Sequence, residues 1–380
     1  MLEVMLKIFS ASFLFFTCVE STKSDYSLRF KLKDKEWTMI DSTTASVIVG
    51  IGASGQFAIA GAANNGVGVF TENYDGNKWS KQPINAGLLM DAAISKNGNL
   101  SVLASLFPVF TSNDGGKTYA PLDGIRGTSQ SASTFGEDSD KFALVGVWLN
   151  SNVSNSDISG VLYSTDSFST WQTSSPIPIG YPRYGAFPSD KVWYVSSGIW
   201  GEASSVDNRD KTYLTSRAYT VRNDTSIHFI ENKNDYSKPA KKATDPTGWF
   251  GAVSKSMDGG ETWVQVLTSD IYNDYYYFNG ISCINELQCV VVGEGEDSQG
   301  GSLTLAFTTF DGGKTWEQSF KSNEYSLMAA YFINTDELWL AGTVVKSGRS
   351  LYGQFRKSTN GGKSFDLVQV SKLYLSKFNF

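Results

Sequence analysis

The sequence has very few of the residues that most metal sites and acyl-transfer sites require. Among 380 residues there is one histidine, His228, and there are three cysteines. Zinc sites combine several His and Cys ligands, and a catalytic triad needs a histidine beside its nucleophile. The alternating stretch "SIHFIE" predicts that His228 is an ordinary strand residue. We therefore expect no cofactor and no metal ion.

Basic residues are outnumbered: 32 Lys and Arg stand against 38 Asp and Glu, which gives a net charge of −6. A nucleic-acid-binding protein needs a basic surface to neutralise phosphates, so nucleic acid is not expected as a partner. Charged residues amount to 18% and hydrophobic residues to 41%. This balance favours a folded globule over a disordered chain.

The start of the chain lacks a hydrophobic run long enough to span a bilayer. Its apolar stretch, Ile8–Val19, follows Lys7 and has the length of a signal-peptide core. We expect residues 1–21 to be a signal peptide. The mature chain is then secreted, or lies in the lumen of the secretory pathway, without stable membrane insertion.

Two kinds of motif agree with a secretory route. Sequons at Asn99, Asn152 and Asn223 predict surface glycosylation. Cys283 and Cys289 are close enough in sequence for a disulfide across one β-hairpin. The alternative is a pair of buried free thiols on neighbouring strands.

What the sequence does contain is glycine, with 36 residues, and aromatic side chains, at 14%. Short runs of Val, Thr and Ser between glycines and asparagines favour many short strands and tight turns. One eight-residue pattern recurs five times, and we call its copies the box turns. They are "SNDGGKTY" from Ser112, "STDSFSTW" from Ser164, "SMDGGETW" from Ser256, "TFDGGKTW" from Thr309 and "STNGGKSF" from Ser358.

The box turns belong to a larger repeat. A strand-like run precedes and follows each one, and two more strands joined by a short turn lie upstream. Tyr275–Gly293 aligns with Glu324–Gly342 at an offset of 49 residues, and Tyr181–Gly198 fits the same frame at an offset of 95. Four strands in about 45 residues predict one blade of a β-propeller.

The prediction is therefore an all-β fold, a propeller of four-stranded antiparallel blades in a single domain over residues 24–380. Seven blades are favoured, with six as the alternative. In the seven-bladed form, Tyr26–Ile40 and the tail Leu373–Phe380 pair to close the ring. The third positions of two successive box turns, Asp166 and Asp258, are 92 residues apart, nearly double the other intervals. This gap predicts an insertion at about 199–248 between the second and third strands of one blade, or a degenerate blade.

A structural role is predicted for the carboxylates of the box turns. An aspartate accepts hydrogen bonds from the backbone just after it, and two glycines supply positive φ angles. Asn360 replaces Asp in the last copy, which keeps the turn and loses a general acid. One carboxylate also offers too few oxygens for calcium. The third positions are Asp114, Asp166, Asp258, Asp311 and Asn360.

At these turns the sequence resembles the Asp-box, or BNR, repeat family, whose pattern Ser-X-Asp-X-Gly-X-Thr-Trp is met in full by Ser256–Trp263. The regular blades with "DGGKTW" look most like the photosystem II stability and assembly factor type. Sialidases and sortilin-type ectodomains share the box. The resemblance implies a propeller with the boxes on the face opposite the ligand-binding face, and it implies little about activity.

On the box-free face, the repeat alignment places Tyr181, Tyr276 and Tyr325 at equivalent positions, with Arg183 beside the first. Tyrosines and an arginine around a channel mouth can hold a sugar or anchor a protein, although packing between blades is the alternative. We interpret the chain as a non-catalytic binding or scaffold module for a protein or glycan. The alternative is a sialidase-type glycoside hydrolase, which must bring a tyrosine, a glutamate and arginines together.

Overall fold

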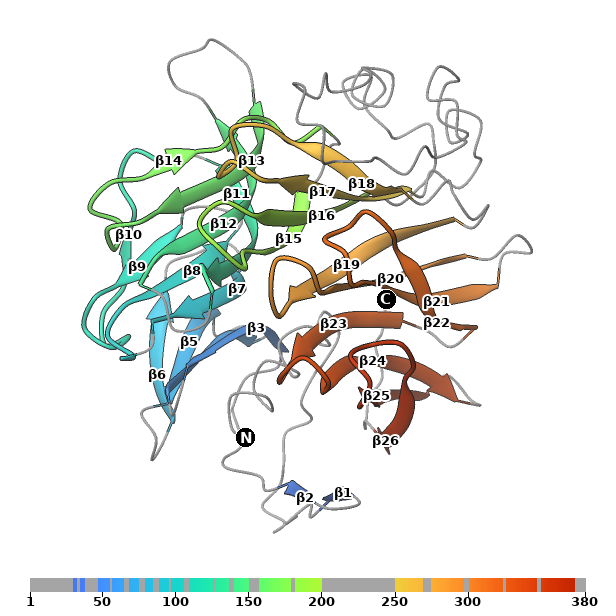
Figure 1. Cartoon of the computed structure of the whole chain (residues 1–380). Coiled ribbons are helices and arrows are strands. Elements are labelled where there is room, and N and C mark those ends of the chain that lie inside the picture. Colours follow the sequence, from blue (N-terminus) through green and yellow to red (C-terminus); the bar gives the residue numbers. More distant parts are fainter. Residues whose placement is uncertain are drawn as a thin grey trace, which may run out of the picture.

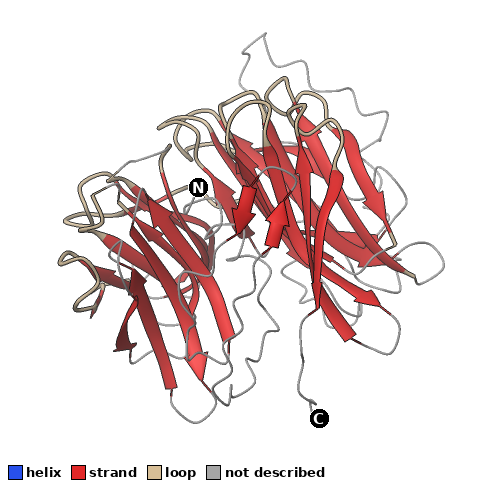
Figure 2. Ribbon diagram, turned by 90° about the horizontal axis from the view of Figure 1, so that it is seen from below, coloured by secondary structure: helices blue, strands red, loops and turns tan. Residues whose placement is uncertain are grey.

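The structure is a computed structural model, and strands account for all of its regular secondary structure. It describes residues 30–32, 35–37, 47–54, 57–64, 68–74, 79–84, 89–95, 97–105, 109–125, 127–136, 140–149, 157–178, 182–199, 250–268, 275–296, 301–323, 326–346 and 350–372. Within these ranges there is no helix (Figure 2). The prediction of an all-β chain is confirmed.

The strands form six four-stranded antiparallel sheets and one two-stranded hairpin. The hairpin is β1 (Phe30–Leu32) and β2 (Lys35–Trp37). The first three sheets contain β3 (Val47–Ser54), β4 (Phe57–Asn64), β5 (Gly68–Tyr74) and β6 (Trp79–Ile84); β7 (Leu89–Ile94), β8 (Ser101–Ser105), β9 (Phe110–Ser112) and β10 (Ala120–Pro121); and β11 (Gly127–Thr134), β12 (Phe142–Leu149), β13 (Asp157–Ser164) and β14 (Gln172–Thr173).

The other three sheets have the same antiparallel order, with each strand paired to the next one in sequence. They contain β15 (Pro182–Ala186), β16 (Trp193–Ile199), β17 (Phe250–Ser256) and β18 (Val264–Thr268); β19 (Tyr275–Cys283), β20 (Cys289–Glu296), β21 (Ser302–Thr309) and β22 (Glu317–Ser322); and β23 (Ser326–Phe332), β24 (Leu338–Lys346), β25 (Ser350–Ser358) and β26 (Asp366–Lys372).

The six sheets follow one another around an arc, with the first strand of each sheet on the inside (Figure 1). Consecutive first strands contact each other: β3 lies against β7, β7 against β11, β11 against β15, β15 against β19, and β19 against β23. This arrangement of radial sheets explains why the strands read as apolar on both faces. Each of the four middle sheets packs between two neighbours.

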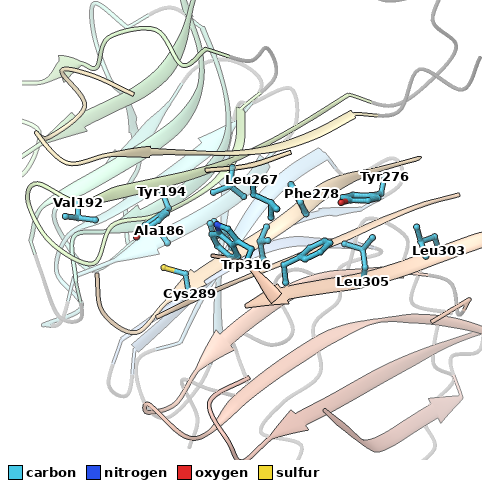
Figure 3. Close-up of a cluster of buried hydrophobic side chains, with 14 residues drawn as sticks. Ala186, Val192, Tyr194, Leu267, Tyr276, Phe278, Cys289, Leu303, Leu305 and Trp316 are labelled. Carbon is cyan, nitrogen blue, oxygen red and sulfur yellow. The ribbon is translucent and has the colours of Figure 1, made fainter. Parts of the chain in front are cut away.

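Side chains from two neighbouring sheets fill the space between them. One cluster joins Tyr194 and Val253 of the fourth sheet to Phe278, Phe307 and other apolar side chains of the fifth, all almost fully buried (Figure 3). Burying apolar area of this kind stabilises a fold by about 25 cal/mol per Å². The contacts between sheets therefore hold the arc together.

Each of the five box turns connects the third strand of a sheet to the fourth. In four of them a backbone N–H of the turn donates to the turn between the first and second strands of the same sheet, as in Gly312 N to Leu287 O at 2.9 Å and Gly361 N to Asp336 O at 2.8 Å. Both kinds of turn therefore lie at one end of the sheets, where Figure 2 shows the described turns gathered. We call this the box end, and the opposite end the box-free end.

Two expectations concerned how the strands are connected: the long insertion and the closing segment near the start of the chain. Strands β16 and β17 pair directly, from Trp193 with Ser256 to Ile199 with Phe250, so residues 200–249 leave and return between the second and third strands of one sheet. The segment Tyr26–Ile40 was expected to pair with the tail of the chain, and within it Phe30–Leu32 pairs with Lys35–Trp37 in a short hairpin. Residues 1–21 and the tail Leu373–Phe380 lie outside the described residues. Within the described part of the chain, no helix is long and apolar enough to cross a membrane.

Candidate functional site

The box turns share one hydrogen-bond pattern that is complete within eight residues. In the fifth sheet, Asp311 Oδ1 accepts from the Thr315 backbone N–H at 2.8 Å, and Asp311 Oδ2 accepts from the Thr315 hydroxyl at 2.6 Å. The Thr309 hydroxyl donates to Asp311 Oδ1 and accepts from Gly313 N. The same bonds recur around Asp114, Asp166 and Asp258.

The third residues of the first and last box turns, Asp114 and Asn360, both agree with a structural role. Hydrogen bonds from Thr118 are the largest influence on Asp114 and lower the pKa of its carboxyl to about 2. Asn360 keeps the pattern, because its Oδ1 accepts from Ser364 N and its Nδ2 donates to the Ser364 hydroxyl. An uncharged amide thus forms the same turn as the carboxylates, so the position does not require a group that can act as an acid or base.

Box turns also bind the neighbouring sheet. Lys255 of the fourth sheet donates to Gly312 O at 2.7 Å, and Gln288 of the fifth sheet donates to Gly361 O at 3.0 Å. The backbone N–H of Ser175 in the third sheet donates to Gly260 O at 2.8 Å. Each of these turns therefore fastens its own sheet to the preceding one.

The first strand of each sheet differs from the box turns, because it contains an irregularity that changes the direction of particular side chains. Each of the six first strands has a β-bulge, in which one extra residue has no partner on the second strand. Bulges re-aim side chains and are frequent beside functional sites. The extra residues are Val49, Met90, Gln130, Arg183, Asn279 and Met328.

Two of these bulge residues reach across to the next sheet. The Arg183 guanidinium lies over the ring of Tyr277, 4.8 Å from its centroid. The Asn279 side-chain amide donates to Leu327 O at 3.2 Å and contacts Met328 Sδ at 3.1 Å. Two bulges thus place a polar side chain against the neighbouring sheet along the inner side of the arc.

Arg183 belongs to a set that we call the inner polar cluster: Asp91, Arg183, Tyr184, Tyr277 and Glu294. The Tyr277 hydroxyl donates to Glu294 Oε1 at 2.5 Å. Asp91 accepts from Ala92 N at 2.9 Å and from Ala132 N, in the next sheet, at 3.1 Å. Strands β7, β15, β19 and β20 of three sheets supply the five side chains.

Both tyrosines of the cluster are held in their neutral form. Burial raises the pKa of Tyr277, and the Glu294 carboxylate raises it further. Burial likewise raises the pKa of Tyr184, with Arg183 opposing the shift and the carboxylates of Asp91 and Glu294 adding to it. At neutral pH each phenol therefore keeps its proton as a hydrogen-bond donor.

Glycines make room for Tyr277 between two sheets. A Cβ atom on Gly198 would lie 2.7 Å from Tyr277 Cβ, and one on Gly251 would lie 3.0 Å from Tyr277 Cα. Gly198 and Gly251 are register partners on β16 and β17. Glycine within a strand marks a close approach of another backbone or of a ligand. Here the approach seats Tyr277 under the Arg183 guanidinium.

The structure contradicts the predicted role of Tyr276. Its side chain is fully buried and packs on Phe278 and Phe307, with ring centroids 5.6 and 5.9 Å apart (Figure 3). It is a core residue between sheets and cannot meet a ligand from solvent. Arg183 is placed at the inner strands as expected, whereas Tyr181 and Tyr325 lie outside the described residues.

The predicted offset of 95 residues is wrong by one. Arg183 and Asn279 are corresponding bulge residues and lie 96 positions apart, while Asn279 and Met328 keep the offset of 49. The prediction aligned Gly198 with Gly293, but the register counterpart of Gly293 is Ser197. A slip of one residue exchanges the two faces of a strand. It therefore concealed Tyr277, which corresponds to Tyr181.

The remaining sequence predictions concern the disulfide, the glycosylation sites and metal binding. A disulfide joins Cys283 to Cys289, which pair across β19 and β20. Asn99 is exposed in a turn at the box end, and Asn152 and Asn223 lie outside the described residues. Among the residues that the structure describes, no three His, Cys, Asp or Glu side chains are grouped so as to hold a metal ion.

No family model matches the sequence, and no curated protein matches it. The fold is similar to a GH74 xyloglucanase from Xanthomonas campestris, with a TM-score of 0.52 at 12% identity over 83% of this chain and 45% of that one. An ulvan lyase of polysaccharide lyase family 25 gives 0.50 at 10% identity over 84% and 82%.

YCF48 bound to a D1 peptide gives a TM-score of 0.46 at 13% identity over 86% of this chain and 82% of that one, too low to carry an argument. The structural matches include β-propeller domains. At these identities they show the fold alone. The chain is an all-β protein of radial, four-stranded antiparallel sheets.

Proposed function

We propose that the protein is a non-catalytic binding module that takes a protein or glycan ligand at its box-free end. The observation that carries the proposal is the inner polar cluster, in which Tyr277 contacts both Glu294 and Arg183, and the carboxylates of Asp91 and Glu294 act electrostatically on Tyr184. Burying a polar group costs stability unless the group is hydrogen-bonded or paired, so a group of buried and half-buried polar side chains at the inner strands is a candidate binding site. Regular packing positions elsewhere on the same strands are apolar.

The position of the cluster supports a ligand site. Asp91, Arg183 and Tyr277 come from the beginnings of β7, β15 and β19, and each of these strands runs toward a turn at the box end. The cluster therefore lies in the half of the inner strands that is nearer the box-free end. The box end is occupied by turns whose hydrogen bonds are satisfied by each other.

Several finer features belong to the same proposal. The arc is completed as a seven-bladed propeller, with residues before β3 and after β26 supplying the last blade, and six blades as the alternative. The chain is secreted or retained in the secretory pathway after loss of residues 1–21, and it acts as a scaffold of the assembly-factor type. The signal-like start and the sequons support this localisation.

A second candidate, a sialidase-type glycoside hydrolase, is favoured by one specific observation. Tyr277, Glu294 and Arg183 come together as the tyrosine, glutamate and arginine that such a mechanism needs. Against it, the Tyr277 side chain is only 7% exposed and its pKa is raised. The cluster also contains a single arginine to hold a substrate carboxylate. These features suit the Tyr277 hydroxyl to act as a fixed hydrogen-bond donor rather than as a nucleophile.

The test is a comparison of the wild-type secreted protein with the Tyr277→Phe variant, which keeps the ring and removes the hydroxyl. Both are applied to a glycan array, a random peptide library and fluorogenic glycosides, after circular dichroism has confirmed folding. Binding without turnover that weakens in Tyr277→Phe supports the module. Turnover that disappears in Tyr277→Phe establishes the hydrolase instead. A ligand that binds both proteins equally rejects the cluster as the site.

A further inference from the structure

We propose that ordered water molecules lie between the third and fourth sheets and bind a group of buried hydroxyls there. These groups, which we call the seam hydroxyls, belong to Ser197, Ser254 and Thr268 of the fourth sheet and to Ser131 of the third. The site shares no residue with the inner polar cluster, and its ligand is water. The inference therefore does not rest on the proposed function.

The seam hydroxyls are almost inaccessible to bulk solvent. Ser197 and Ser254 are 0% exposed, Ser131 is 3% exposed and Thr268 is 6% exposed. None of the four side-chain oxygens has a hydrogen-bond partner among the described residues. Leaving a buried hydroxyl without a hydrogen bond is costly, and most buried polar groups in proteins bond either to protein or to ordered water.

Three of the seam hydroxyls lie next to one another on a single face of the fourth sheet. Ala252 pairs with Ser197 on one side and with Thr268 on the other. Ser254 is two residues further along β17. Paired residues, and residues two apart on one strand, lie on the same face of a sheet. Ser254 is therefore the diagonal neighbour of both other hydroxyls, at a spacing of about 7–8 Å.

That face is turned toward the third sheet. Val195 pairs with Ser254, so these two residues share a face. Val195 packs with Val145 and Val161 of the third sheet in one buried cluster. On the third sheet, Ser131 pairs with Val145 and so lies on the face that is turned to the fourth. The seam hydroxyls thus come from the two surfaces that enclose one space.

The chemistry of this space suits water. A buried water needs two to four polar partners, and a hydroxyl can both donate to it and accept from it. A water that bonds two oxygens joins groups that are about 5–6 Å apart. One or two waters therefore span the diagonal between neighbouring seam hydroxyls. Ala252, which lies between the three hydroxyls of the fourth sheet, has only a methyl group to fill the area.

A high-resolution crystal structure of the wild-type chain and thermal melts of variants test the inference. Thr268→Val keeps the shape of the side chain and removes only the hydroxyl, and Ser254→Ala removes the second one. Thr268→Ser keeps the hydroxyl and loses a methyl group. Ser129→Ala is the matched control, because the buried Ser129 hydroxyl bonds directly to the backbone of Ser105 in the second sheet.

We expect the crystal structure to show a water within hydrogen-bond distance of at least two seam hydroxyls. Thr268→Val should lower the melting temperature by about 2–6 °C, because the water loses a partner. Combined with Ser254→Ala, it should cost less than the sum of the two single losses, since both changes remove bonds to shared water. Ser254→Ala should instead add in full to Ser129→Ala and to Thr268→Ser.

Three results overturn the inference. If Thr268→Val raises the melting temperature, its hydroxyl was dry, because an apolar group of the same shape improves on an unbonded polar one. If the losses in Ser254→Ala and Thr268→Val add in full, no water is shared between them. If the wild-type crystal structure shows no water between the two sheets, or shows these hydroxyls bonded to another part of the chain, the site does not exist. This last result decides the question even where a variant fails to fold.

Discussion

The box end and the inner polar cluster occupy opposite halves of the same sheets and differ in how they depend on the repeat. Every box turn builds the same bonds from the same positions, whether the third residue is Asp or Asn. The bulges also recur in every first strand, but the residues in them do not: they include Met90, Arg183 and Asn279. One region repeats its side chains, and the other repeats only its backbone.

This difference separates structure from function in a repeat protein. A feature that each sheet needs for its own folding must appear in each sheet. A ligand contacts the assembled protein once, so its site can draw different residues from equivalent positions. The predictions below test whether the box end serves stability alone and whether the inner cluster is built for something else.

The largest effect is expected at the aromatic residue that ends a box turn. Trp316 is buried between the fourth and fifth sheets, whereas Trp171, at the same position of its box, is 36% exposed. We expect Trp316→Ala to lower the free energy of unfolding by about 3–5 kcal/mol in urea titrations, because it leaves a large cavity. Trp171→Ala serves as the control and should cost less than about 1 kcal/mol. Equal losses would contradict the assignment of the core.

The next effect concerns the glycine that seats Tyr277. A methyl group on Gly198 collides with Tyr277 Cβ, so Gly198→Ala should lower stability by about 1–3 kcal/mol. The same variant should also weaken ligand binding, unlike any change at the box end. A double-mutant cycle with Tyr277→Gly, which removes the Cβ atom that the methyl group meets, measures the coupling. Additive losses would show that the two residues do not constrain each other.

An aspartate of the box end should be replaceable by an amide. Asp311→Ala removes the acceptor of the Thr309 and Thr315 hydrogen bonds and should cost about 1–3 kcal/mol of unfolding free energy. Asp311→Asn should cost less, because Asn360 builds the same turn. Neither variant should change ligand affinity. A loss of affinity in Asp311→Asn would give the box end a functional role that the proposal denies.

A smaller gain is expected where a box turn departs from its pattern. Ser167 and Phe168 adopt φ angles of 62° and 61° at positions that other copies fill with glycine. Left-handed backbone is unfavourable for these residues, so Ser167→Gly should raise stability by roughly 0.5–1 kcal/mol. The reverse change at the matching position, Gly312→Ser, should lower it. Thermal melts of the two variants should therefore shift in opposite directions.

The smallest effect is a dependence on pH. The pKa of Asp114 is lowered to about 2 in the folded protein, so its stabilising effect is present above about pH 4 and is lost as the pH falls toward 2. Burial raises the pKa of Asp311, but the hydrogen bonds from Thr315 and Thr309 together outweigh it, so the pKa of this carboxyl is lowered as well. An Asp114→Asn/Asp311→Asn double variant should show a shallower fall of melting temperature over that range. A fall as steep as that of wild type would mean that other carboxylates dominate acid unfolding.

The sequence alone determines the all-β class, the four-strand repeat and the box turns. All of these rest on short-range rules: two glycines with positive φ, an aspartate two residues after a Ser or Thr, and alternating strands. Each can be recognised within about fifty residues, because the repeat presents it several times.

The inner polar cluster was decided by the tertiary structure. Asp91, Arg183 and Glu294 are ordinary acids and bases in the chain, and Tyr277 is one of three adjacent tyrosines. The predicted offset of 95 differs by one residue from the register of the paired strands, and a slip of one residue exchanges the two faces of a strand. Which tyrosine enters the core and which meets Arg183 therefore depends on the register of strands and on the packing of separate sheets, and neither is written in a local pattern.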